Sequence, residues 1–130
     1  MTDDVSAPAL KPKVAFVVDD EKAIASTLAL ILNHAGFDAH AFFGGQEAVD
    51  SLDKLQPDLL ITDVMMPGMN GIEAAIITHT KLPKCKILLF SGQAATVDLL
   101  AVARSEGHDF EILAKPVHPS DLLEKIRNQP

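Results

Sequence analysis

Five short runs of apolar residues, each followed by a longer segment with helical spacing, restrict the fold of this chain more than any other feature. The apolar runs cover residues 14–18, 37–42, 59–62, 87–90 and 110–113. The segments 22–35, 46–55, 71–80, 94–105 and 120–128 carry apolar residues at the intervals typical of an amphipathic helix. This strict alternation predicts parallel strands joined by right-handed crossover helices.

The apolar runs are continuous rather than alternating with polar residues, which indicates strands covered on both faces. We therefore expect an α/β fold, a five-stranded parallel sheet in (βα)5 order that is doubly wound like flavodoxin. The length of 130 residues suits one such domain. We expect a flexible tail over residues 1–12 and the domain over 13–128, with no output domain in this chain.

Charge and cysteine content exclude several classes of function. The chain has 11 basic and 18 acidic residues, a net charge of -7, which argues against binding nucleic acid or an anionic membrane and favours metal cations and basic partners. The single cysteine, Cys85, allows no intrachain disulfide and fits a reducing compartment. The sequence has no signal peptide and no apolar stretch of membrane-spanning length, so we expect a cytoplasmic protein.

Charged and hydroxyl-bearing residues stand where four of the predicted strands end. In chain order they are Asp19, Asp20 and Glu21, then Asp63, then Ser91 with Gly92, and finally Lys115 with Pro116. Ligands of open α/β sheets bind at the carboxyl ends of the strands, so these side chains should converge. Carboxylates that repel one another favour a hard cation such as Mg²⁺, and the lysine adds a further positive charge. This combination suits phosphoryl transfer, which depends on positioning and charge neutralisation.

The same segments resemble the receiver domain of response regulators. They are VVDDE at 17–21, ITDVMMPGMNG at 61–71, LLFSG at 88–92 and LAKP at 113–116. The resemblance extends over about residues 13–127. One such segment alone would mean little, but four in this order, each at a strand end, are a specific signal.

The resemblance implies a role for each matching residue. Asp63 is the phospho-acceptor and, with Asp20 and the backbone carbonyl of Met65, a direct ligand of Mg²⁺, while Asp19 acts on the metal through a bound water. Ser91 and Lys115 bind the phosphoryl group. The resemblance further implies that Pro116 follows a cis peptide bond.

The function implied is that of a phosphoryl-accepting switch of two-component signal transduction, of the stand-alone single-domain type. Its donor would be the phosphohistidine of a sensor histidine kinase or of a histidine phosphotransfer protein. Its output would be a protein contact through the face of the fourth helix, fifth strand and fifth helix, where a homodimer could also form. We do not expect an ordinary enzyme, although Mg²⁺-dependent self-phosphorylation and self-dephosphorylation are implied.

One departure from the family keeps an alternative open. Receivers commonly carry Tyr or Phe three residues before the lysine, and here that switch position is Ile112. Phe110 lies two residues earlier, on the same strand face by period-2 alternation, and could substitute. The alternative is a receiver-like binding module that works without phosphorylation. A flavin carrier is disfavoured, because an acidic triplet replaces the phosphate-binding loop after the first strand.

The remaining candidates for chemistry receive structural interpretations. The five histidines are His34, His40, His79, His108 and His118, and they show no metal-ligand spacing, so we expect them in loops or at the surface. Cys85 precedes a predicted strand and has no neighbouring histidine in the sequence, which indicates a structural thiol.

Overall fold

Five parallel strands form the centre of the structure, a computed structural model that describes residues 12–92, 96–115 and 118–127. The strands are β1 (Val14–Val18), β2 (Asp38–Phe42), β3 (Leu59–Asp63), β4 (Lys86–Ser91) and β5 (Glu111–Ala114). Their order across the sheet is β2-β1-β3-β4-β5, with every neighbouring pair parallel. The strand order reverses between β1 and β3, which is where ligands bind in sheets of this kind.

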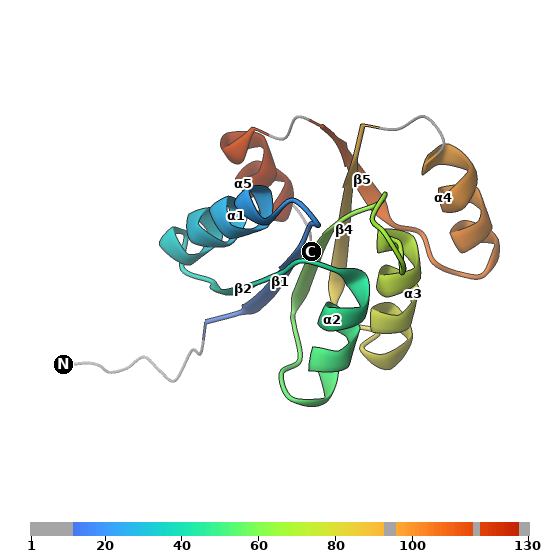
Figure 1. Cartoon of the computed structure of the whole chain (residues 1–130), viewed down its shortest axis with the longest axis horizontal. Helices are drawn as coiled ribbons and strands as arrows, with labels where there is room; N and C mark the ends of the chain where they lie inside the picture. Colours follow the sequence, from blue (N-terminus) through green and yellow to red (C-terminus); the bar gives the residue numbers. More distant parts are fainter. Residues whose placement is uncertain (1–11, 93–95, 116–117, 128–130) are drawn as a thin grey trace.

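Helices cover both faces of the sheet (Figure 1). They are α1 (Lys22–His34), α2 (Gly45–Asp50) with the 3₁₀ turn η1 (Ser51–Asp53), α3 (Gly71–Lys81), α4 (Thr96–Ser105) and α5 (Pro119–Arg127). Helices α1 and α5 lie on one face, and α2, α3 and α4 lie on the other. The predicted (βα)5 flavodoxin-like fold is confirmed.

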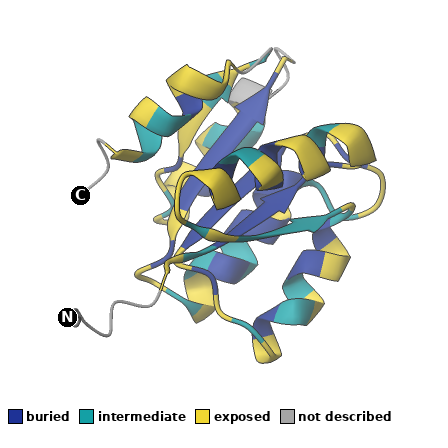
Figure 2. Cartoon of the chain, turned by 90° about the vertical axis from the view of Figure 1, so that its left-hand side faces the viewer, coloured by how far each residue is buried: buried dark blue, intermediate teal, exposed yellow. Residues whose placement is uncertain are grey.

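Alternate residues of the central strands fill two separate cores. In β1, Phe16 and Val18 face the core beneath α2, α3 and α4, while Ala15 and Val17 face the core beneath α1 and α5. All four side chains are fully buried. Figure 2 shows this buried sheet between helices whose outer surfaces are exposed. Burial on both faces explains why the strand segments are continuously apolar.

The edge strand β5 differs from the strand predicted over residues 110–113. It begins at Glu111, so Phe110 precedes it and packs into the core on the α3 side, at 8% exposure. Ile112 is 39% exposed. A strand at the edge of the sheet has a neighbour on one side only, and here Glu111, Ile112 and Ala114 all reach solvent. The expectation that both faces are covered therefore holds for the central strands but not for β5.

A capping box formed by Asn70 and Glu73 starts α3. Oδ1 of Asn70 accepts from the backbone N–H of Glu73 at 2.8 Å, and Oε1 of Glu73 accepts from the backbone N–H of Asn70 at 2.9 Å. Each bond satisfies a donor that the helix itself leaves unpaired. The box fixes where the chain turns from the Asp63 loop into α3.

Within the described residues, no helix is both long enough and apolar enough to cross a membrane.

Candidate functional site

Three aspartates gather at the carboxyl ends of β1 and β3. Asp19, Asp20 and Asp63 each place one carboxylate oxygen within 4.8 Å of the other two. Asp19 is fully buried, Asp63 is 7% exposed and Asp20 is exposed. We call these three residues the acidic rim. A cluster of carboxylate oxygens at this spacing is chemically suited to a hard divalent cation.

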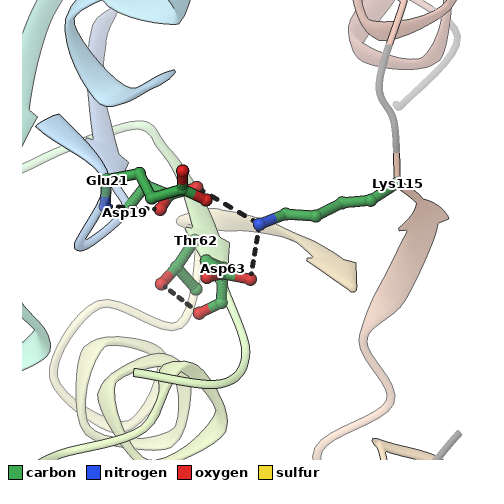
Figure 3. Close-up of polar contacts among 5 residues, drawn as sticks. All are labelled: Asp19, Glu21, Thr62, Asp63 and Lys115. Carbon is green, nitrogen blue, oxygen red and sulfur yellow. Dashed lines mark hydrogen bonds and ion pairs between the residues drawn. The ribbon is translucent and has the colours of Figure 1, made fainter. Parts of the chain in front are cut away.

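Lys115 reaches this cluster from β5, across the intervening strand β4. Its Nζ lies 3.1 Å from Oδ1 of Asp63 and 3.4 Å from Oδ2 of Asp19 (Figure 3). The ammonium also sits 5.5 Å from the ring centroid of Phe90, in a cation–π contact. One lysine therefore neutralises part of the charge of two buried carboxylates.

The second oxygen of Asp19 is also engaged. Oδ1 of Asp19 accepts from the backbone N–H of Glu21 at 2.9 Å, which fixes the turn into α1. The backbone N–H of Asp19 donates to the carbonyl of Phe42 in the neighbouring strand at 3.1 Å. Asp19 is consequently held on both carboxylate oxygens, whereas Asp20 projects to the exposed side of the rim.

The backbone around Asp63 is fixed by two residues that the sequence interpretation did not single out. Thr62 donates its hydroxyl to the carbonyl oxygen of Asp63 at 2.9 Å. Gly71 packs against the same carbonyl so closely that a Cβ on it would stand 1.9 Å from the oxygen. The N–H of Gly71 donates to the carbonyl of Val64 at 2.8 Å. The only hint in the sequence is a glycine directly after Asn70, a residue type that often caps helices.

Burial and charge shift the pKa values at the rim. Burial raises the pKa of Asp63 above its ordinary value, and the nearby charge of Asp19 raises it further, while Lys115 opposes both. Burial alone would lower the pKa of Lys115, but its hydrogen bonds and ion pairs with Asp63 and Asp19 outweigh this and raise it. Lys115 therefore stays protonated. Its charge does not fully offset the burial of Asp63 and the repulsion between Asp63 and Asp19, because the pKa of Asp63 remains raised.

A cavity of about 440 Å³ opens over the rim. It is lined by Asp20, Glu21, Asp63, Met65, Gly92 and Lys115. Met65 is 45% exposed at its edge. Ser91 ends β4 beside the cavity and is buried, and its carbonyl accepts from the backbone N–H of Lys115 at 3.1 Å. Pro116, where the resemblance implies a cis bond, lies outside the described residues.

The candidate switch residues lie apart from this cavity. Ile112 is on the edge strand with its side chain partly in solvent. Phe110 does not share that exposure, because its ring is buried and stacks on His108 at 5.7 Å between ring centroids. Phe110 therefore does not take the place that an aromatic residue at 112 would occupy.

The chain is a doubly wound α/β domain with a cluster of carboxylates, suited to a divalent cation, at the point where the strand order reverses. The family model for the response regulator receiver domain matches residues 15–127. The DNA-binding response regulator MtrA of Mycolicibacterium paratuberculosis is 32% identical over 111 residues, which is 85% of this chain and 48% of the relative. MtrA of Mycobacterium tuberculosis gives the same identity over 85% of this chain and 47% of the relative.

Solved structures of response regulators superpose on this chain. A CheY-like response regulator receiver domain protein from Methanospirillum hungatei superposes with a TM-score of 0.81 at 28% identity, covering 90% of this chain and 92% of that one. A putative response regulator from Chloroflexus aurantiacus gives a TM-score of 0.75 at 30% identity, covering 91% and 97%.

The chain belongs to the response regulator receiver domain family. Response regulators are the components of two-component systems that pair with histidine kinases. The chain spans about half the length of the curated relatives it matches.

Proposed function

We propose that this receiver domain accepts a phosphoryl group on Asp63 from the phosphohistidine of a histidine kinase or a phosphotransfer protein. The observation that supports this most directly is the arrangement around Asp63, a buried carboxylate that borders an open cavity and is contacted by Lys115. An Asp63 oxygen would attack phosphorus in line with the bond to the donor imidazole. The new O–P bond forms as the P–N bond breaks, and the ring nitrogen keeps the electron pair.

The donor set of the rim fits Mg²⁺. Asp20 and Asp63 would hold the ion directly with the backbone carbonyl of Met65. Asp19 would act through a bound water, because both of its oxygens already accept from Glu21 and Lys115. Magnesium characteristically uses one or two carboxylates and keeps several waters. When bound, it would neutralise charge on the transferring phosphoryl group.

The chain's own residues account for the remaining steps. Lys115 would exchange its ion pair with Asp63 for one with a phosphoryl oxygen, a movement of only the flexible end of its side chain. Ser91 would donate its hydroxyl to another phosphoryl oxygen. Thr62 and Gly71 would keep the carbonyl side of Asp63 fixed, so that only its carboxylate faces the cavity.

We propose that the output is a protein contact on the face of α4, β5 and α5. Two apolar side chains are exposed there, Val102 of α4 at 56% and Ile112 of β5 at 39%. The ion pair of Lys125 with Glu111, at 2.7 Å, links α5 to β5 across the same face. The net charge of -7 makes this chain poorly suited to bind nucleic acid. We therefore do not extend to it the DNA binding that the names of the MtrA relatives describe.

Beryllofluoride, a non-covalent mimic of a phosphoryl group, tests this proposal without a donor protein. We expect its addition with Mg²⁺ to shift the amide NMR signals of Asp63, Ser91 and Lys115 in the wild type and not in Asp63→Asn. Shifts in the wild type that are unchanged in Asp63→Asn would contradict the assignment. A folded wild type that responds to neither beryllofluoride nor acetyl phosphate would favour the phosphorylation-independent binding module.

A further inference from the structure

Two histidines that lie 29 residues apart in the sequence meet at the opposite end of the sheet from the acidic rim. His79 is in the last turn of α3, and His108 is in the loop between α4 and β5. Their Nδ1 atoms are 2.8 Å apart. The acidic rim does not involve either residue, and their sequence spacing gave no reason to pair them.

Neighbouring groups hold both imidazoles in place. The two rings are steeply inclined, at 74°, with centroids 5.0 Å apart. Phe110 lies edge-to-face with His79 at 5.9 Å and stacks on His108 at 5.7 Å. The backbone N–H of His108 donates to the carbonyl of Ala103 at 2.9 Å, which ties its loop to α4. The two nitrogens are therefore set by packing as well as by their mutual hydrogen bond.

The separation of the two nitrogens is that of a hydrogen bond, and one ion could take both nitrogens once each ring has turned so that its lone pair points at the ion. With metal–nitrogen bonds of about 2.0–2.1 Å, two nitrogens 2.8 Å apart subtend about 85° at a shared ion. A tetrahedral angle would require a separation of about 3.3 Å with the same bonds. An angle near 90° corresponds to adjacent corners of a square plane or an octahedron, the geometry of Cu²⁺ and Ni²⁺.

The surroundings offer access and a carboxylate close by in the chain, although no third ligand atom of the described residues lies within 4.8 Å of both Nδ1 atoms. A cavity of about 230 Å³ beside His79 is lined by two acidic residues, Asp109 and Glu111, and by two basic ones, Lys84 and Lys86. Asp109 directly follows His108, and its carboxylate is 79% exposed in an ion pair with Arg104 at 3.3 Å. An exposed ion pair of this kind is weak, so the carboxylate can leave it at little cost. The acidic chain also attracts cations in general.

We propose that His79 and His108 form a binding site for Cu²⁺ or Ni²⁺, coordinated through both Nδ1 atoms. Water would complete the set, or Asp109 once its carboxylate has left Arg104 and moved toward the pair. In the ion-free pair one Nδ1–H donates to the other Nδ1. Binding requires the proton between the two rings to leave Nδ1, because a metal-bound ring nitrogen carries no proton. The bound ion would join α3 to the α4–β5 loop. The proposal is independent of phosphorylation at Asp63.

The test uses untagged protein in excess Mg²⁺, which competes for the acidic rim. Cu²⁺ is added, and its affinity is measured by calorimetry and its ligands by electron paramagnetic resonance. The variants are His79→Gln and His108→Gln, with His34→Gln as the matched control, since His34 is exposed on the last turn of α1. We expect one ion per chain with nitrogen hyperfine coupling in the wild type and the control. Either pair variant should bind at least about tenfold more weakly.

A second measurement protects the test against variants that fold poorly. Cu²⁺ broadens NMR signals of nearby nuclei, so in the wild type the broadening should centre on His79, His108 and the start of β5. Equal affinity in the wild type and both pair variants would overturn the proposal. Broadening centred on Asp19 and Asp63, or a spectrum with oxygen ligands alone, would also overturn it.

Discussion

The ammonium of Lys115, which directly follows β5, lies 3.1 Å from the carboxylate of Asp63 at the end of β3, although β4 separates the two strands. The same nitrogen is 3.4 Å from Asp19, so removing it leaves two buried carboxylates facing one another. We expect Lys115→Met to lower the free energy of unfolding at neutral pH by about 1–3 kcal/mol, measured by urea denaturation.

The matched control for this change is Lys125→Met. Lys125 also forms an ion pair, with Glu111 at 2.7 Å, but both side chains are more than a third exposed, so its loss should cost less than about 1 kcal/mol. Because the pKa of Lys115 is raised, its stabilising effect is present at neutral pH and is lost only as alkaline pH deprotonates it. Equal losses in the two variants would contradict the importance of the rim contact.

The charge of Asp63 should destabilise the fold. Burial raises the pKa of Asp63, so the native state binds this proton more tightly than the unfolded chain does. Ionisation above the ordinary carboxyl pKa of 3.8 therefore costs stability. We expect Asp63→Asn to be more stable than the wild type at neutral pH, and the advantage to shrink as the pH falls toward this value. Thermal unfolding across this pH range measures the difference.

Asp53→Asn is the control for this comparison, because the side chain of Asp53 is 86% exposed in a long ion pair with Lys81. It should show no comparable gain at any pH. If Asp63→Asn were less stable than the wild type at neutral pH, the ion pair with Lys115 would outweigh the cost of burial, contrary to this account.

Gly71 should tolerate no side chain. A Cβ would stand 1.9 Å from the carbonyl oxygen of Asp63, and that backbone cannot retreat without disturbing β3. We expect Gly71→Ala to lower the free energy of unfolding by about 3 kcal/mol or more. Gly44→Ala is the control, because nothing lies within 4 Å of its Cβ position, and it should cost less than about 1 kcal/mol. Similar costs for both, by urea denaturation, would count against the close approach.

Cys85 should be inert in the folded protein. It is 6% exposed, and burial raises the pKa of its thiol to about 12, with a further contribution from Asp58. Thiolate is the reactive form, so a disulfide reagent at about pH 8 should label the native chain far more slowly than the chain in denaturant. The single cysteine makes the readout unambiguous. Equally fast labelling in both states would show that the thiol is accessible.

The sequence was sufficient to predict the fold, and the predicted fold was sufficient to bring the residues of the acidic rim together. Apolar runs alternating with helical segments imply parallel strands, and parallel strands bring Asp19, Asp63 and Lys115 to one edge. The sequence could not show that one ammonium would contact both carboxylates, because this depends on the tilt of side chains across β4.

Other features depended on tertiary packing alone. Period-2 alternation put Phe110 with Ile112, but β5 begins after Phe110, and its ring turns into the core. The requirement for glycine at position 71 comes from a carbonyl eight residues earlier, which no local pattern reports. The contact of His79 with His108 joins a helix end to a distant loop, so sequence spacing could not predict it.

Intact mass spectrometry shows directly whether Asp63 accepts a phosphoryl group. The protein is incubated with Mg²⁺ and acetyl phosphate beside Asp63→Ala, with Asp98→Asn, an exposed aspartate of α4, as the control. We expect a gain of about 80 Da, one phosphoryl group, in the wild type and the control. This gain should require Mg²⁺ and be absent from Asp63→Ala. An equal gain in Asp63→Ala, or one that is independent of Mg²⁺, would contradict the assignment of Asp63 and the acidic rim.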